Sequence, residues 1–131
     1  MSEEIANRFI EGLGRLEAEQ ALDDIVALFA EDCDVGNVVT PRQFKGRDGA
    51  WEFWQSYRGT FGNVKSDFRN VIVTGNLAAL EWVSKGTTAD GHPISYEGVS
   101  ILEIEGEKIK RFRAYFDPSK LGRQLADEAK A

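Results

Sequence analysis

The chain has 131 residues, 42% hydrophobic and 29% charged, a composition typical of one globular domain spanning residues 1–131. Its formal net charge of -6 opposes binding to nucleic acid and to anionic membranes, and no apolar run approaches the roughly 20 residues that cross a bilayer. The single cysteine, Cys33, excludes an intrachain disulfide, and the acidic segment Ser2-Glu3-Glu4 is unlike a signal peptide, so we expect a reducing, cytoplasmic location.

The first half of the chain has the apolar spacing of three helices separated by one extended segment. The first helix begins at Ser2, a residue suited to the N-cap, and its apolar stripe is Ile5, Phe9, Leu13 and Leu16. The stripe of the second helix is Leu22, Ile25, Val26 and Phe29. An extended segment follows at residues 33–39, and Asp48 is then placed to cap a third helix. The aromatic stripe of that helix is Trp51, Trp54, Tyr57 and Phe61.

From Val64 onward, apolar and polar residues alternate as they do in β-strands. The turn sequences are Thr74-Gly75-Asn76, Asp90-Gly91 and Glu105-Gly106-Glu107. They delimit four predicted strands, at residues 64–73, 77–88, 94–104 and 108–116. Turns this short join antiparallel neighbours, so the strands form a meander. Pro118 then favours a short final helix, because proline suits the first helical position.

This order of elements predicts an α+β fold. In detail, we expect a cone-shaped, curved antiparallel sheet with three N-terminal helices packed over its concave face and a short C-terminal helix. The outer face of the sheet would carry the apolar side chains of Val83, Val99 and Ile101. A monomer would leave these side chains in water, so we expect a homodimer.

Three segments carry a resemblance to a known family. They are Gly46-Arg47-Asp48, Ala79-Leu80-Glu81-Trp82 and Arg113-Ala114-Tyr115-Phe116-Asp117-Pro118. With the order of elements, they resemble the nuclear transport factor two-like superfamily, and within it the SnoaL-like group, relatives of polyketide cyclases and ketosteroid isomerases. The resemblance extends over residues 5–125. It implies a pocket for a small hydrophobic molecule, with isomerase, cyclase or hydrolase chemistry or with none.

Residue by residue, the resemblance argues against two of these chemistries. Phe9, Asn37 and Ser100 stand where ketosteroid isomerases have an oxyanion-holding tyrosine, a proton-shuttling aspartate and a protonated carboxylic acid. None of the three can perform those steps. Trp82 and Ser84 stand where epoxide hydrolases have an Arg-Asp pair. We therefore expect neither mechanism here.

Asp117 is the carboxylate that remains, because the cyclases and epoxide hydrolases also use an acid at this strand end. At the rim of an aromatic cavity, desolvation would favour its neutral form, which makes Asp117 the candidate catalytic residue. The other interpretation is that Asp117, directly before Pro118, caps the last helix, and both roles can hold. Strand alternation places Asp117 on the face of Arg113 and Tyr115, so a bulge or the end of the strand must turn it inward.

The expected pocket combines aromatic walls with small polar contacts. The predicted walls are Phe9, Trp54, Tyr57, Trp82 and Tyr96. The predicted polar contacts are Asn37, Ser84 and Ser100. The same pattern also fits a filled core with serines bonded to the backbone, so an enzyme and a non-catalytic binding or dimerisation module both stay open.

Other kinds of site are not expected. One cysteine and one histidine cannot supply the usual ligands of zinc, and the acidic run of Glu31, Asp32 and Asp34 is more typical of a solvated turn than of a metal site. His92 follows a hairpin turn, where an exposed position is expected. The sequence contains no glycine-rich phosphate motif and no signature of a covalent cofactor, so we expect no cofactor.

Overall fold

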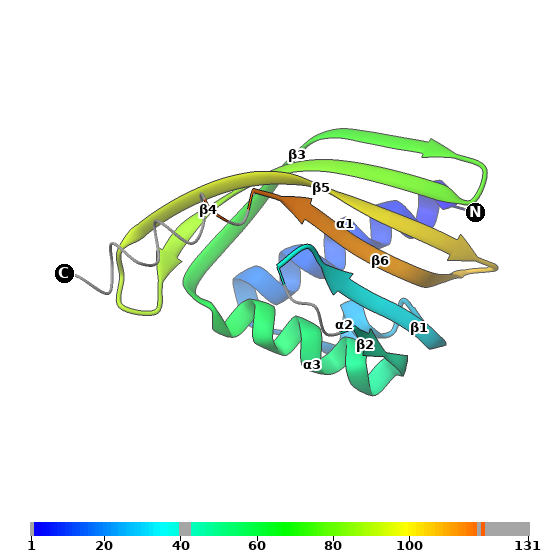
Figure 1. Ribbon diagram of the computed structural model, residues 1–131, viewed down its shortest axis with the longest axis horizontal. Helices are drawn as coiled ribbons and strands as arrows, with labels where there is room; N and C mark the ends of the chain where they lie inside the picture. Colours follow the sequence, from blue (N-terminus) through cyan, green and yellow to red (C-terminus); the bar gives the residue numbers. More distant parts are fainter. Residues whose placement is uncertain (1, 40–42, 118, 120–131) are drawn as a thin grey trace.

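The computed structural model describes residues 2–39, 43–117 and 119. The elements are α1 (Ser2–Glu19), α2 (Asp23–Val26), β1 (Phe29–Asn37), β2 (Phe44–Lys45), α3 (Gly46–Gly59), β3 (Phe61–Thr74), β4 (Leu77–Thr88), β5 (Pro93–Glu105) and β6 (Lys108–Phe116). The long strands β3, β4 and β5 bend over α1 and α3, which lie on the inner side of the curve (Figure 1). Except for Ser119, the predicted final helix lies outside the described residues. The fold is α+β, as predicted.

All strands belong to one mixed sheet in the order β2-β1-β6-β5-β4-β3, which does not close on itself. The predicted meander from β3 to β6 is confirmed, and Leu80 of β4 pairs with Val71 of β3 and Ser100 of β5. The prediction of a purely antiparallel sheet is wrong, because β1 runs parallel to β6, with Val35 beside Phe112. Parallel neighbours need a long connection between them, which α3 and the meander provide here.

Two aromatic residues that were predicted to lie in helices are instead the first residues of strands. Phe29 begins β1 opposite Ile109 of β6, so that α2 is limited to Asp23–Val26. Phe61 begins β3 opposite Thr88 of β4. In both places, strand pairing satisfies backbone groups that a helix end leaves open, and it overrides the helical spacing of the apolar residues.

Helix α3 differs from its prediction in its first residue and in its buried face. It begins at Gly46, and Asp48 lies within the first turn rather than at the cap. Trp51 is 41% exposed, whereas Phe53 is 7% exposed. The helix packs against β1 through a face that contains both Phe53 and Trp54, so Trp51 is turned outward.

The interior has two parts. The larger cluster lies between the helices and the sheet and contains both aliphatic and aromatic side chains. We call its aliphatic side chains that are at most 1% exposed the aliphatic core: Ile5, Leu16, Ile25, Val35, Leu80, Leu102 and Ile109. A second cluster is mainly aromatic and consists of Phe61, Val64, Trp82, Ile94 and Tyr96. Tyr57, Phe68 and Phe116 pack against both clusters. The boundary between them therefore crosses the middle of the long strands.

Gly98 lies at this boundary, opposite Trp82 of β4 and Phe116 of β6. A Cβ atom at position 98 would lie 2.9 Å from Trp82 Cζ2 and would overlap the carbonyl oxygen of Tyr115. Glycine within a strand is typical of places where another group approaches the backbone closely. Its missing side chain lets the Trp82 and Phe116 side chains pack against β5.

Within the described residues, no helix combines the length and the apolar character needed to cross a membrane.

Candidate functional site

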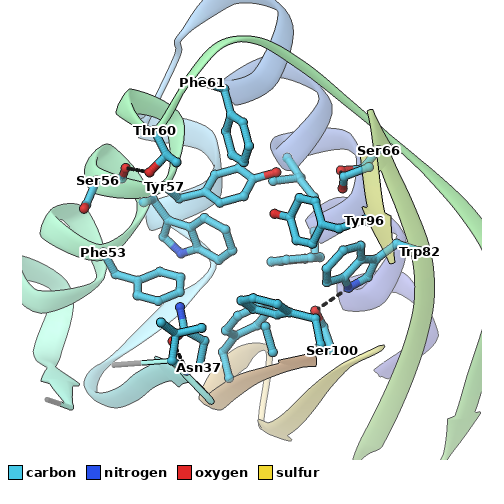
Figure 2. A pocket seen from close by; sticks show the side chains of 18 of the residues that line it. Asn37, Phe53, Ser56, Tyr57, Thr60, Phe61, Ser66, Trp82, Tyr96 and Ser100 are labelled. Atoms are coloured by element: carbon cyan, nitrogen blue, oxygen red, sulfur yellow. Dashed lines mark hydrogen bonds between the residues drawn. The ribbon is translucent and has the colours of Figure 1, made fainter. Parts of the chain in front are cut away.

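A cavity of about 280 Å³ lies between the two long helices and the inner face of the sheet. Its aromatic lining is Phe9, Phe44, Phe53, Trp54, Tyr57, Phe61, Phe68, Trp82, Tyr96, Phe112 and Phe116. Its polar lining is Asn37, Ser56, Thr60, Ser66, Ser84 and Ser100. We call this cavity the aromatic pocket; Figure 2 shows the labelled rings and hydroxyl groups arranged around its centre. Apolar walls with a few polar groups are typical of sites for small organic molecules.

All the residues predicted to bind a ligand line this pocket. They are Phe9, Asn37, Trp54, Tyr57, Trp82, Ser84, Tyr96 and Ser100. The structure thus brings together residues from α1, β1, α3, β4 and β5. Contact of these side chains with a ligand stays a prediction.

Strand alternation explains how the sheet supplies its share of the lining. Trp82 and Ser84 are two residues apart on β4, and so they face the same side of the sheet. Tyr96 and Ser100 occupy the same face of β5. The Trp82 and Tyr96 rings meet edge to face, with centroids 5.2 Å apart, an arrangement that aromatic pairs favour.

The indole N–H groups of Trp82 and Trp54 differ in their hydrogen bonding. Trp82 Nε1 donates a hydrogen bond to Ser100 Oγ at 2.9 Å. Trp54 Nε1 is buried and has no partner among the described residues. A buried donor without a partner is costly, so an acceptor atom of a ligand would be favoured beside Trp54.

Asp117 lies at the end of β6, exposed to solvent, and it is not among the residues that line the pocket. Its Oδ1 accepts hydrogen bonds from Ser119 N at 3.0 Å and Ser119 Oγ at 2.8 Å. The bond from the backbone N–H two residues ahead is the bond that an N-cap residue makes. Except for Ser119, the helix that Asp117 would cap lies outside the described residues, so the capping role and the catalytic role both stay predictions.

The other titratable residues considered from the sequence lie outside the pocket. His92 is exposed beside the turn between β4 and β5. Glu31 and Asp32 are exposed on β1, and Asp32 pairs with Lys110. In the part of the chain that the structure describes, no group of three or more metal-binding side chains is close enough to hold an ion.

Glu17, a carboxylate on α1 that is only 5% exposed, was not predicted as a site residue from the sequence. Its Oε2 accepts hydrogen bonds from Tyr57 Oη at 2.7 Å and Ser66 Oγ at 2.6 Å, and its Oε1 accepts one from Ser66 N at 2.8 Å. Glu17 is four residues after Leu13, so helical spacing places both on the same side of α1. That spacing was the available signal, but an acidic residue near a helix end is usually solvated.

Tyr57, which is half-buried, and the buried Tyr96 both stay protonated at neutral pH. Burial raises the pKa of Tyr57 well above its usual value, and Tyr96 and Glu17 raise it further. Burial also raises the pKa of Tyr96, with Glu17 adding to the effect. Both phenols therefore act as hydrogen-bonding groups rather than as phenolate bases.

The family of the chain follows from a comparison of its sequence with domain families. The profile of the SnoaL-like domain matches residues 6–112. The chain belongs to the SnoaL-like family. No curated protein matches this SnoaL-like chain by sequence.

Solved structures share the fold of this chain. An NTF2-like protein from Anabaena variabilis ATCC 29413 has a TM-score of 0.82 and 17% identity over 92% of each chain. A protein with a ketosteroid isomerase-like fold from Catenulispora acidiphila DSM 44928, in complex with trimethylamine, has a TM-score of 0.79 and 17% identity over 90% of this chain and 92% of its own. An LEH-like epoxide hydrolase from M. tuberculosis has a TM-score of 0.73 and 15% identity over 95% and 91%. At these identities, the likeness concerns the fold alone.

Proposed function

We propose that this SnoaL-like protein binds a small, mainly apolar molecule in the aromatic pocket. The observation that carries the proposal is the cavity of about 280 Å³ inside a small domain. Protein interiors are normally packed without such voids, so a cavity of this size is a functional feature that burial alone does not require. The trimethylamine complex of the Catenulispora acidiphila protein supports the use of this fold for small molecules.

A matched pair of variants on β6 tests the proposal. Ala114 lines the pocket, whereas its neighbour Tyr115 points outward and is 43% exposed. Small lipophilic carbonyl compounds and benzyl derivatives serve as ligands, with binding followed by thermal shift and calorimetry. Ala114→Leu should narrow the cavity and weaken binding, and Tyr115→Leu should preserve it. A ligand that binds Ala114→Leu as tightly as the natural protein would show that it binds elsewhere.

Acid–base chemistry at Asp117 is the finer part of this proposal. If the protein transforms its ligand and Asp117 takes the proton, Asp117→Asn should abolish turnover while the circular dichroism spectrum and the melting temperature change little. Unchanged turnover in a folded Asp117→Asn variant would restrict the residue to capping.

The second candidate is a binding module without chemistry. It is favoured by the exposed position of Asp117, which bonds to Ser119, and by Phe9, Asn37 and Ser100 at the positions where isomerases carry reactive groups. The two candidates differ in product formation. Incubation with a bound ligand, followed by mass spectrometry, should return the ligand unchanged if the module is non-catalytic.

We also propose that the protein forms a homodimer through the outer face of the sheet. Val83, Val99 and Ile101 are half-buried on this face, away from the helices. Pairing with a second copy would remove their apolar surface from water. Light scattering at micromolar concentration should give twice the chain mass, and Val99→Lys should give one chain mass. A monomer mass for the natural protein would contradict the proposal.

A further inference from the structure

Glu17 is a buried carboxylate that is held by neutral groups. The hydroxyls of Tyr57 and Ser66, and the Ser66 backbone N–H, all donate to it. None of the lysines and arginines within the described residues forms an ion pair with it. Because a buried carboxylate needs donors or positive charge nearby, Glu17 fixes the direction of every hydrogen bond around it.

The direction of each hydroxyl hydrogen determines whether Tyr57, Ser66 and Ser84 donate or accept hydrogen bonds in the pocket. A hydroxyl has one hydrogen, and Tyr57 and Ser66 both direct theirs to Glu17. Ser66 Oγ lies 2.6 Å from Ser84 Oγ, so Ser84 must donate in that bond. Tyr57 and Ser84 line the pocket, and because their hydrogens are already used, only their oxygen lone pairs can bond to a ligand. This polar wall, made of Tyr57, Ser66 and Ser84, therefore accepts hydrogen bonds and does not donate them.

Tyr96 supplies an independent observation at the same place. It is 6% exposed, and it lines the pocket. In Figure 2 the hydroxyls of Tyr57 and Tyr96 both point to the centre of the pocket, with Ser66 nearby. The field of Glu17 reaches this hydroxyl, since it helps to raise the Tyr96 pKa. A hydroxyl that points into the pocket is available to bond a polar atom of a ligand.

We propose that Glu17 is a positioning residue that makes the polar wall an acceptor, so that the pocket selects an apolar ligand bearing a hydroxyl or an ammonium group. This inference rests on the proposed ligand binding. The hydrogen-bond donor of the ligand points to Tyr57 and Ser84, while Tyr96 can donate or accept as the ligand requires. The surrounding rings favour a cationic donor further, through their negative faces. The carboxylate itself does not line the pocket and acts through Tyr57 and Ser66.

This polarity is the reverse of an oxyanion-binding wall, which donates hydrogen bonds to the ligand. A carbonyl or carboxylate oxygen directed at the polar wall would face the lone pairs of Tyr57 and Ser84. It would also be repelled by the negative charge of Glu17 behind them. Ligands that differ only in one polar group can therefore measure the effect.

The test uses four ligands that share one benzyl body: toluene, benzyl alcohol, benzylamine and benzoate. By calorimetry, the alcohol and the amine should bind at least about tenfold more tightly than toluene, and benzoate should bind more weakly than either of them. Either order between alcohol and amine supports the proposal and tells which donor is preferred. Equal binding of all four would overturn this inference and leave the proposed function standing. Binding of none of them would overturn both.

Glu17→Gln tests the positioning role. The amide of glutamine donates as well as accepts, so one hydroxyl of Tyr57 or Ser66 turns its proton away from residue 17, and the wall becomes a donor. Benzylamine binding should fall about tenfold, and benzoate binding should rise. The matched control is Glu11→Gln, the same change at an exposed position of α1. A purely structural role would weaken all four ligands together.

A second variant keeps the test decisive if Glu17→Gln does not fold. Tyr57→Phe leaves the carboxylate in place and removes one acceptor oxygen from the polar wall. The preference for benzyl alcohol over toluene should shrink severalfold, while toluene binds as before. An unchanged preference in folded Tyr57→Phe would contradict the proposed role of the wall.

Discussion

The aliphatic core and the aromatic pocket are built on the same strands, yet only the first is filled. On β4, Leu80 belongs to the core, whereas Trp82 and Ser84 line the pocket. On β5, Leu102 belongs to the core, whereas Ser100, two residues earlier on the same face, lines the pocket. The branched side chains of Leu80 and Leu102 fill their positions, whereas the serines at positions 84 and 100 are too small to fill the space beside the rings. A step of two residues along a strand is enough to pass from core to cavity.

This contrast follows the inner face of β5, where Leu102, Ser100, Gly98 and Tyr96 lie in one row. Each of them contributes differently to stability and to the pocket. Substitutions along this single row can therefore test the contrast without changing the strand.

The largest effect is expected for Leu102→Ala, in the filled region. Leu102 is 0% exposed, and its removal leaves a cavity that its neighbours cannot close. The free energy of unfolding should fall by about 2–5 kcal/mol, measured by urea denaturation. Ligand affinity of the folded protein should stay the same. A loss below 1 kcal/mol, about half the lower bound of that range, would mean that this region is loosely packed.

Gly98→Ala comes next, at the boundary between the regions. The added methyl group would press on Trp82 and on the Tyr115 carbonyl, so β5 or its neighbours must move. We expect a loss of about 1–3 kcal/mol by urea denaturation, together with altered near-ultraviolet circular dichroism from Trp82. Gly75→Ala is less suitable as a control, because Gly75 has a φ of +55°. Gly14→Ala, where a Cβ atom meets nothing within 4 Å, should not destabilise the protein.

The pocket tyrosines predict how stability depends on pH. Burial and Glu17 raise the pKa of Tyr96 in the folded state, so the unfolded chain loses this proton first as pH rises. Stability from this group is complete below about pH 10 and falls above it by up to about 1.4 kcal/mol per pH unit. Urea denaturation from pH 9 to pH 11 should show a smaller decline for Tyr96→Phe than for the natural protein. Parallel curves would contradict burial of the hydroxyl.

The smallest effect is expected for Ser100→Ala, in the pocket. This change removes the acceptor of the Trp82 indole N–H, at a position where water in the cavity can replace it. The free energy of unfolding should fall by about 1 kcal/mol, well below the loss in Leu102→Ala. Equal losses in the two variants would remove the distinction between core and pocket.

Much of the fold and of the pocket lining could be predicted from the sequence. Alternation and short turns predicted the meander, and the family resemblance directed attention to Asn37, Ser84 and Ser100, which line the cavity. Neither source predicted the parallel pairing of β1 with β6, because strand order depends on contacts between distant segments. Phe29 could not be placed for the same reason, because it begins a strand through pairing with Ile109, 80 residues further along the chain.

Glu17 could not be predicted for a different reason. Its burial depends on Ser66 and Tyr57, which lie 49 and 40 residues further along the chain. Hydrogen bonds at such separations leave no local pattern, and an isolated glutamate in a helix is usually exposed. Asp117 illustrates the converse: its hydrogen bonds go to Ser119, two residues away, so a local rule can address them.

The central claim, that the cavity binds small apolar molecules, is tested most directly by NMR of the tryptophan indole N–H groups. The three tryptophans provide the probe and its control, since Trp54 and Trp82 line the pocket, and Trp51 is 41% exposed on the outer side of α3. On titration with benzyl alcohol, the Trp54 and Trp82 signals should shift and saturate together, while the Trp51 signal stays in place. Shifts confined to Trp51, or none at saturating ligand, would contradict the claim.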